Sequence, residues 1–347
     1  MTEGRAPGEI PGLRMEDVFS TRELPGGPLP LVLAPRRAMS RGAFLEALGG
    51  YGNELRDRML RHGGLLFRGF PLESAKDFAD AVSALATGPA VQYIGGDSPR
   101  TKIEGPVYTS TEAPRGVKIP LHNELSFVRD YPKNIFFYCD VAPKEHGETI
   151  LGDARRVYRE MDPAVRDRFV EKRIRYVSCY FGESLLMDLV NALQPSHKSW
   201  KAVFETEDRA EVERLCREHD FTFEWHGDWI RISQTRPATL EHPVTGETVW
   251  FSQPHLYDFN PRLLGGWRWV GAKLFYARRH TRLHEVFHAD GSKVRREDLY
   301  HLMDVLDRAT VAFPWERGDF LVLDNVLTMH GRATFSSPRR ILAAMTS

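Results

Sequence analysis

The chain has 347 residues, and 47 Lys and Arg residues balance 47 Asp and Glu residues, so its formal net charge at pH 7 is zero. A hydrophobic fraction of 42% and a charged fraction of 27% are those of a globular protein with a sizeable core. This composition excludes a disordered tail, a collagen or a coiled coil. A neutral chain is also not the basic protein expected to bind nucleic acid or an anionic membrane surface.

The N-terminal segment and the cysteines favour a cytoplasmic protein. Residues 1–17 are polar and rich in Gly and Pro, without the apolar segment of a secretory signal. No stretch approaches the roughly 18 consecutive apolar residues of a membrane span. Cys139, Cys179 and Cys216 are too few and too scattered for a disulfide framework. We therefore expect reduced thiols and a cytoplasmic location.

The predicted elements begin after a flexible arm or irregular wrap over residues 1–30. A helix over 40–62, interrupted at Gly49-Gly50, precedes a short apolar strand over 63–70. A helix over 73–87 has Ser74 at its N-cap. Further helices are expected at 153–161, 163–172, 207–218 and 296–309, and further strands at 135–141, 173–180, 229–233, 248–252, 319–324 and 340–345.

Many short strands with helices outside them favour a β-sandwich or jelly-roll core. The alternation of strand and helix that builds a doubly wound sheet is missing, and there is no GxGxxG or GxxxxGK[ST] loop. Thr245-Gly246 predicts a hairpin turn between the strands at 229–233 and 248–252.

The most informative pattern is IPLHNELS at residues 119–126. Residues two apart on a strand point to one face, so His122 and Glu124 would present an imidazole and a carboxylate side by side. These are two of the three ligands of a 2-His-1-carboxylate facial triad, which binds Fe(II) and leaves positions open for a cosubstrate and O2. Spacing alone more often marks a solvated pair on a half-exposed strand.

A third ligand has to come from a distant histidine. His330 is the best candidate, within a strand-like run over 324–332. Arg339 and Arg340 then open the last apolar run. A buried arginine binds a carboxylate bidentately, as the C5 carboxylate of 2-oxoglutarate would require. Adjacent strand residues face opposite sides, so only one of the two arginines can point inward.

With these residues in place, the chain resembles the taurine dioxygenase (TauD/TfdA) family of Fe(II)- and 2-oxoglutarate-dependent oxygenases. It is most similar to the SyrP-like branch found in nonribosomal-peptide gene clusters. The resemblance spans roughly residues 60–346. The matching stretches are VYTSTE at 107–112, PLHNELSF at 120–127, HGET at 146–149, HPVTGETVWFSQ at 242–253 and WERGDFLVLDNVLTMHGRATFSSPRRILAAM at 315–345.

The resemblance implies a double-stranded β-helix (jelly-roll) core with inserted and flanking helices. Residues 31–347 would be a single catalytic domain. The Fe(II) ligands that the resemblance implies are His122, Glu124 and His330. Thr149 matches a family threonine that binds one carboxylate of 2-oxoglutarate, and Arg339 or Arg340 matches the arginine that anchors the other. Such a site uses O2 as second cosubstrate to oxidise an unactivated C–H bond, while the protein supplies geometry and a dry pocket.

Two departures from the family pattern bear on the substrate and the cofactor loop. Glu124 stands where most of the wider family has Asp, and glutamate is familiar there in relatives that oxidise amino acids at Cβ. His146 replaces the first glycine of the usual Gly-Gly-Glu-Thr, which could alter the loop that carries Thr149.

We therefore expect hydroxylation of an amino acid or amino-acid derivative, with Cβ favoured, in natural-product biosynthesis. The substrate is a small molecule, either free or presented by a peptidyl carrier protein, and a homo-oligomer is allowed. Oxidative cyclisation, desaturation and epoxidation use the same ligands and stay open. Segments 85–118 and 181–205 are expected to form the lid and much of the substrate pocket.

Two readings from other classes compete. HEVFH at 284–288 matches the zinc-peptidase motif, but that motif needs a continuing helix, and Asp290-Gly291-Ser292 predicts a turn directly after it. A dioxygenase-like fold could also serve as an inactive binding protein. The intact set of three ligands with the paired arginines argues against that reading.

Overall fold

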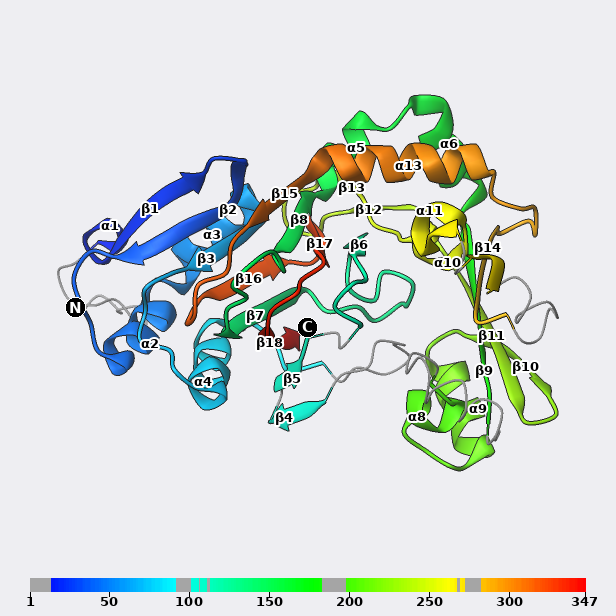
Figure 1. Cartoon of the computed structure of the whole chain (residues 1–347), viewed down its shortest axis with the longest axis horizontal. Helices are drawn as coiled ribbons and strands as arrows, with labels where there is room; N and C mark the ends of the chain where they lie inside the picture. The colour runs from blue at the N-terminus through cyan, green and yellow to red at the C-terminus, as the bar shows by residue number, and fades with distance from the viewer. Residues whose placement is uncertain are drawn as a thin grey trace, which may run out of the picture.

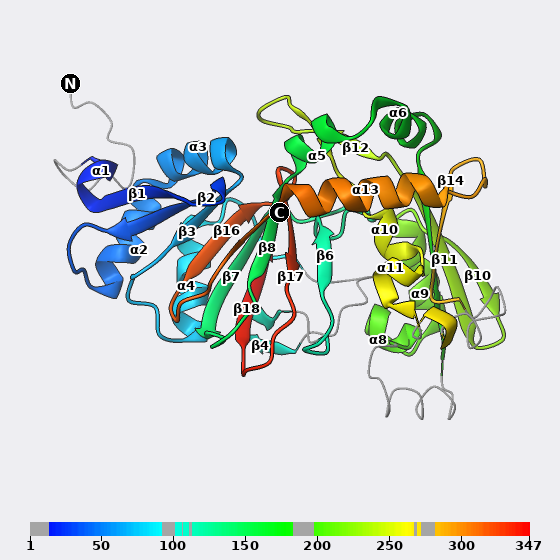
Figure 2. The same cartoon turned by 45° about the horizontal axis from the view of Figure 1, so that its top comes forward.

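The computed structural model describes residues 14–91, 101–105, 107–110, 113–182, 198–266, 269–271 and 282–347. Two sheets pack face to face at its centre (Figure 2). The larger sheet has the order β1 (Phe19–Leu24), β2 (Gly27–Pro35), β3 (Gly64–Phe67), β16 (Phe320–Asp324), β7 (Asn134–Val141), β18 (Arg340–Thr346), β5 (Val107–Thr109) and β4 (Lys102–Glu104). The smaller sheet has the order β15 (Thr310–Phe313), β8 (Thr149–Asp153), β17 (Thr328–Arg332) and β6 (Ile119–His122).

Alternating side chains of the large sheet build two separate hydrophobic cores. On β7, Phe137 faces the small sheet, where it shares a cluster with Leu151 of β8 and Phe313 of β15. Phe136 and Tyr138 of the same strand point to the opposite face. A strand buried on both faces reads as a continuous apolar run, which is why β7 is apolar from Ile135 to Cys139, its buried part.

Helices cover the outer face of the large sheet (Figure 1). They are α1 (Met15–Val18), α2 (Arg41–Gly50), α3 (Gly52–His62) and α4 (Ala75–Leu85). Ser74 caps α4 as predicted, because its hydroxyl oxygen accepts a hydrogen bond from the Asp77 N–H at 3.1 Å. The predicted helix over 40–62 is two helices that meet at Tyr51.

A second layer lies on the other side of the small sheet, around a third hydrophobic cluster (Figure 1). It contains a four-stranded sheet of order β10 (Thr222–His226), β11 (Trp229–Arg236), β9 (Ile174–Tyr180) and β14 (His284–His288). The helices of this part are α5 (Ala154–Glu160), α6 (Pro163–Lys172), α8 (Trp200–Phe204), α9 (Arg209–Glu218), α10 (Pro254–Tyr257), α11 (Pro261–Leu264) and α13 (Arg296–Ala309).

The predicted N-terminal arm is wrong for residues 15–30. After α1, β1 and β2 form an antiparallel hairpin, and β2 pairs in parallel with β3. β1 is an edge strand whose middle residues are exposed, so its sequence is polar and has no apolar alternation. Its polar sequence and the prolines of β2 conceal both strands from pattern analysis.

The predicted hairpin has the right turn but the wrong first strand. β12 (Thr239–Glu241) pairs with β13 (Thr248–Trp250) around the turn that contains Thr245-Gly246. The segment at 229–233 lies in β11, which pairs with β9 and β10 instead. A strand of three residues is too short to show a period, which explains the misassignment.

The jelly-roll core with inserted and flanking helices is confirmed as the fold. All three cysteines are buried. Burial raises the pKa of the Cys139 thiol to about 12, so this thiol stays protonated and unreactive at neutral pH. In the described ranges, no helix combines the length and apolar character that crossing a bilayer requires.

Candidate metal centre

Two histidines face each other across neighbouring strands of the small sheet. β6 and β17 run antiparallel, and their register pairs His122 directly with His330. The centroids of the two imidazole rings lie 4.5 Å apart. Residues 208 positions apart in the sequence are thereby placed at one end of the barrel, because cross-strand neighbours have adjacent side chains.

Glu124 completes the group from a turn rather than from the strand. β6 ends at His122, and Leu125 after the glutamate has a positive φ of 53°. The expected side-by-side placement on one strand is therefore wrong in detail. The turn still brings Glu124 Oε2 to 3.5 Å from His330 Nε2, and one ligand atom from each of the three residues lies within 4.8 Å of the others.

The donor set and its environment fit a divalent metal ion. His122 is neutral, since burial and the neighbouring His330 lower its pKa to about 3. Its Nδ1 lies 2.9 Å from the Pro120 carbonyl oxygen and is the donor there, which leaves Nε2 free to bind a metal. The Glu124 carboxylate is also buried, and a bound cation would balance its charge. Two imidazoles and one carboxylate are the ligand set of non-haem Fe(II) oxygenases.

A cavity of about 420 Å³, its open mouth included, adjoins the two histidines. Its polar lining includes Thr149 of β8 and Arg339, which directly precedes β18. Arg339 Nε donates to the Gly147 carbonyl at 2.7 Å, and Nη2 donates to Thr149 Oγ1 at 3.3 Å. Apolar side chains, among them Phe137 and Ile341, form much of the remaining wall.

The structure distinguishes the two candidate arginines. Arg339 points into the cavity, whereas Arg340 points outward, is 51% exposed and pairs with Asp140 at 3.3 Å. Burial, and then repulsion by Arg332, lower the pKa of Arg339 to about 10, which still leaves it charged at neutral pH. Among the described residues, no carboxylate forms an ion pair with Arg339. The cavity therefore has an unneutralised positive charge suited to an anionic ligand.

The loop before Thr149 accommodates the histidine that replaces the family glycine. His146 and Gly147 both have positive φ, 56° and 77°. The His146 side chain is exposed, and the loop still delivers Thr149 to the cavity. Thr149 Oγ1 accepts hydrogen bonds from Trp315 Nε1 at 3.1 Å and from Arg339 Nη2. With both lone pairs engaged, the hydroxyl proton of Thr149 is available to donate into the cavity.

Sequence reasoning missed two buried residues that organise this site. Asn325, fully buried, holds the backbone of Glu124 through its side-chain amide. Arg332 donates to the carbonyls of Ala113, Pro114 and Val117 at 2.8–2.9 Å and thereby fixes that segment beside the cavity. The one available signal was a polar side chain at the end of an otherwise apolar strand run.

Comparison with known proteins identifies the family. A family model described as "Taurine catabolism dioxygenase TauD, TfdA family" matches residues 42–346. The chain belongs to the TauD/TfdA family. As a TauD/TfdA protein it is an Fe(II)- and 2-oxoglutarate-dependent dioxygenase, which confirms the expected enzyme class and cofactors.

Individual TauD/TfdA relatives match over most of the chain. A clavaminate synthase-like protein of Arabidopsis thaliana is 31% identical over 330 residues, which are 92% of this chain and 93% of the relative. The dapdiamide synthesis protein DdaC of Enterobacter agglomerans is 34% identical over 286 residues, 82% of each chain. The same fold is found in the solved structure of PvcB, an Fe, alpha-ketoglutarate dependent oxygenase from an isonitrile synthetic pathway. The TM-score is 0.52 at 15% sequence identity, and the match covers 96% of this chain and 93% of PvcB.

The HEVFH motif is not a zinc site. Residues His284–His288 form strand β14, paired with β9, and not a helix. Four residues along a strand span about 13 Å, too far for His284 and His288 to share a metal ion. Glu285 instead pairs with Arg231 at 3.0 Å and with Arg282 at 2.9 Å. The zinc-peptidase alternative is therefore excluded.

Of the two expected lid segments, substantial parts lie outside the described residues, at 92–100, 106, 111–112 and 183–197. Ser110, from the first segment, lines the cavity. Ala113–Val117 lies beside it, held by Arg332.

Proposed function

We propose that this TauD/TfdA enzyme hydroxylates an sp3 carbon, Cβ by preference, of an amino acid or amino-acid derivative in natural-product biosynthesis. In this proposal Fe(II) is held by His122, Glu124 and His330. The observation that carries the proposal is the convergence of these three side chains beside the cavity that contains Arg339.

The cavity residues have distinct tasks toward 2-oxoglutarate. Arg339 offers a fixed fork of donors to the C5 carboxylate, and the apolar part of the cavity wall strengthens the attraction between the two charges. The free hydroxyl proton of Thr149 adds a second donor to a cosubstrate carboxylate. Trp315 holds the Thr149 oxygen in place, so this donor is preorganised. When bound, Fe(II) and 2-oxoglutarate supply the activation of O2, and the chain supplies position and water exclusion.

The choice of substrate class rests on the relatives and on Glu124. The 34% identical relative is named as a dapdiamide synthesis protein, and the 31% identical relative as clavaminate synthase-like. Both names support a substrate in specialised metabolism. The glutamate ligand matches the branch that oxidises amino acids at Cβ, and it disfavours halogenation, which typically needs a small residue in place of the carboxylate.

The test is a turnover screen with Fe(II), 2-oxoglutarate and O2. Free amino acids form one arm, and the same amino acids loaded on a peptidyl carrier protein form the other. Succinate formation coupled to a product that has gained one oxygen atom supports hydroxylation. A product that has lost two hydrogens instead indicates desaturation or cyclisation. Glu124→Ala is the matched control, and full activity in this variant would overturn the ligand assignment.

A further inference from the structure

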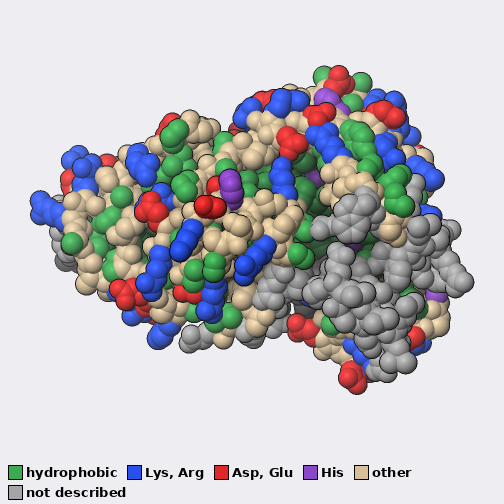
Figure 3. All heavy atoms as spheres, viewed as in Figure 1, with side chains coloured by type: hydrophobic (Ala, Val, Ile, Leu, Met, Phe, Trp, Pro, Cys, Tyr) green, Lys and Arg blue, Asp and Glu red, His purple; other side chains and the backbone are tan. Residues whose placement is uncertain are grey.

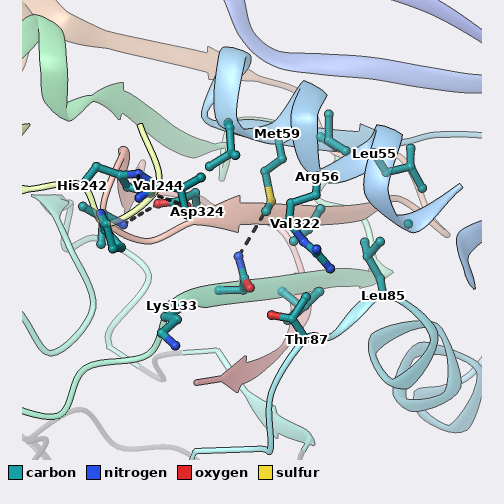
Figure 4. Close-up of a pocket in the computed structure, with 17 residues that line it drawn as sticks. Leu55, Arg56, Met59, Leu85, Thr87, Lys133, His242, Val244, Val322 and Asp324 are labelled. Atoms are coloured by element: carbon teal, nitrogen blue, oxygen red, sulfur yellow. Dashed lines mark hydrogen bonds and ion pairs between the residues drawn. The ribbon is translucent and has the colours of Figure 1, made fainter. Parts of the chain in front are cut away.

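A second pocket lies on the outer face of the large sheet, apart from the metal centre. Its floor is Phe136 of β7 and Val322 of β16, and its upper wall is α3, through Leu55 and Met59 (Figure 4). Leu85, the last residue of α4, closes one side. The pocket measures about 720 Å³ with its open mouth, and it shares no lining residue with the active-site cavity.

The pocket is an opening in the helical cover of the sheet. Side chains on this face belong to the cluster that α2, α3 and α4 bury, but between α3 and the end of α4 the sheet is left partly uncovered. At the rim, Val244 in the β12–β13 turn is 70% exposed. The walls are therefore suited to an alkyl chain, whose burial is favourable by about 0.8 kcal/mol per methylene group.

Two cations border this apolar surface. Arg56 extends from α3 over the pocket toward the side where Thr87 lies, and Lys133 comes from the segment before β7 (Figure 4). Both side chains are exposed, and neither forms an ion pair with a carboxylate of the described chain. The polar contact of Arg56 is to Asn53 Oδ1, at 3.5 Å. Figure 3 shows Lys and Arg side chains around apolar atoms on this face, between α3 and α4.

One buried polar group points to a ligand as well. Asn134 is 8% exposed and lines the pocket. In the described structure its side chain makes a single hydrogen bond, from Nδ2 to the Met59 thioether sulfur at 3.8 Å. Sulfur is a weak acceptor, and a buried amide ordinarily has stronger partners. A ligand oxygen in the pocket would supply one.

Two other polar lining residues, His242 and Asp324, are already committed to each other. His242 Nε2 lies 3.1 Å from Asp324 Oδ2, and His242 Nδ1 accepts from the backbone N–H groups of Val244 and Thr245. Because Nδ1 accepts, Nε2 is the donor to Asp324. This pair fixes the β12–β13 turn against β16. The groups left for a ligand are therefore Asn134, Arg56, Lys133 and the exposed hydroxyl of Thr87.

We propose that this pocket binds a free, small amphipathic monocarboxylate. Its alkyl chain lies between α3 and the sheet, Asn134 donates to its carboxylate, and the positive charges of Arg56 and Lys133, on opposite sides of the pocket, attract it. A neutral hydrocarbon would leave both cations and the amide unused. A short polar anion would leave the apolar floor uncovered.

The experiment titrates octanoate into the whole protein by isothermal calorimetry, with Mn(II) and 2-oxoglutarate present at saturation so that the Arg339 cavity is occupied. We expect one octanoate per chain. Octanol, which lacks the charge, and acetate, which lacks the chain, should each bind at least about tenfold more weakly, since each forfeits one of the two kinds of contact.

Variants locate the site. Arg56→Gln combined with Lys133→Gln changes exposed residues only, so the fold should persist, and octanoate should bind on the order of tenfold more weakly. Arg61→Gln, a matched change on an exposed residue of α3 outside the pocket, should leave binding unaltered. Absence of octanoate binding, equal affinity for octanol, or an unchanged affinity in the double variant would overturn the proposal.

Discussion

The side-chain amide of Asn325 holds both backbone polar groups of Glu124. Asn325 Oδ1 accepts from the Glu124 N–H at 2.8 Å, and Asn325 Nδ2 donates to the Glu124 carbonyl at 2.9 Å. The same Nδ2 donates to the Pro132 carbonyl at 2.8 Å, and Asn123 Nδ2 donates to the Asn325 carbonyl at 2.6 Å. The turn that carries Glu124, the proposed carboxylate ligand, is thus fixed to the strand end that precedes His330, the proposed third ligand.

Replacing Asn325 should weaken metal binding. Asn325→Ala removes both bonds to Glu124, and Asn325→Asp keeps an acceptor but loses the donor. Supporting residues of this kind typically contribute on the order of 10- to 100-fold to metal affinity, so we expect a loss in that range for Asn325→Ala and a smaller one for Asn325→Asp. Mn(II) titration by calorimetry measures it.

The control for this prediction is Asn53→Ala, a change at an exposed asparagine of α3. Thermal unfolding of each metal-free variant separates positioning from general stability. A variant that loses stability but retains the wild-type Mn(II) affinity would show that Asn325 supports the fold and not the ligand geometry.

Substitution of the two neighbouring arginines should give opposite results. Arg339→Gln removes the charged fork inside the cavity, and a charge-assisted bidentate contact is worth about 1.5–3 kcal/mol, so the KM for 2-oxoglutarate should rise on the order of 10- to 100-fold. Arg340→Gln removes only an exposed pair with Asp140 and should change KM less than about twofold. Steady-state kinetics at varied 2-oxoglutarate concentration measure both KM values. Equal effects of the two substitutions would contradict the assignment of Arg339 as the arginine that binds 2-oxoglutarate.

Thr149 should act through its hydroxyl. Thr149→Val keeps the shape of the side chain but leaves no donor to the cosubstrate and no acceptor for Trp315 and Arg339, so the 2-oxoglutarate KM should rise about 5- to 20-fold. Thr149→Ser restores the hydroxyl and should recover most of the loss. If Thr149→Val binds 2-oxoglutarate as tightly as the wild type in a calorimetric titration, the threonine is not a cosubstrate ligand.

Acid should destabilise the protein through a buried histidine outside the metal centre. His255 is fully buried, its Nε2 lies 3.0 Å from the Leu121 carbonyl, and burial lowers its pKa to about 4. The unfolded chain takes up this proton below about pH 6.5, whereas the folded chain does so only near pH 4. The contribution of neutral His255 to the stability of the fold is therefore complete above pH 6.5 and is lost as the pH falls toward 4.

Urea unfolding of the metal-free protein at pH 7.5 and pH 5 measures this effect. His255 alone should lower the free energy of unfolding by about 2 kcal/mol over that interval. His255→Gln can keep the hydrogen bond to Leu121 and does not titrate. Its free energy of unfolding should therefore fall by about 2 kcal/mol less than that of the wild type over the same pH interval. Identical pH dependence in the two proteins would contradict the role given to His255.

The sequence predicts the parts of the fold that carry a period or a motif. Continuous apolar runs reveal β7 and β16. The spacing of His122 and Glu124 suggests two of the ligand candidates, and His330 comes from a strand-like run and the family resemblance. Asn325 and Arg332 escape notice because single polar residues at strand ends have no periodicity, and their partners lie far away in the chain. The choice between Arg339 and Arg340 needed the actual register of β18, which shifts irregularly at Arg340 and Ile341.

The measurement that tests the central claim most directly is an anaerobic titration of the purified protein with Fe(II) and 2-oxoglutarate. It follows the weak visible absorption that Fe(II) gains when 2-oxoglutarate chelates it, and it needs no knowledge of the substrate. We predict that the absorption appears in the wild type, disappears in His330→Ala, and requires much more 2-oxoglutarate in Arg339→Gln. A wild-type protein that shows no such absorption, and no 2-oxoglutarate binding by calorimetry, would contradict the account.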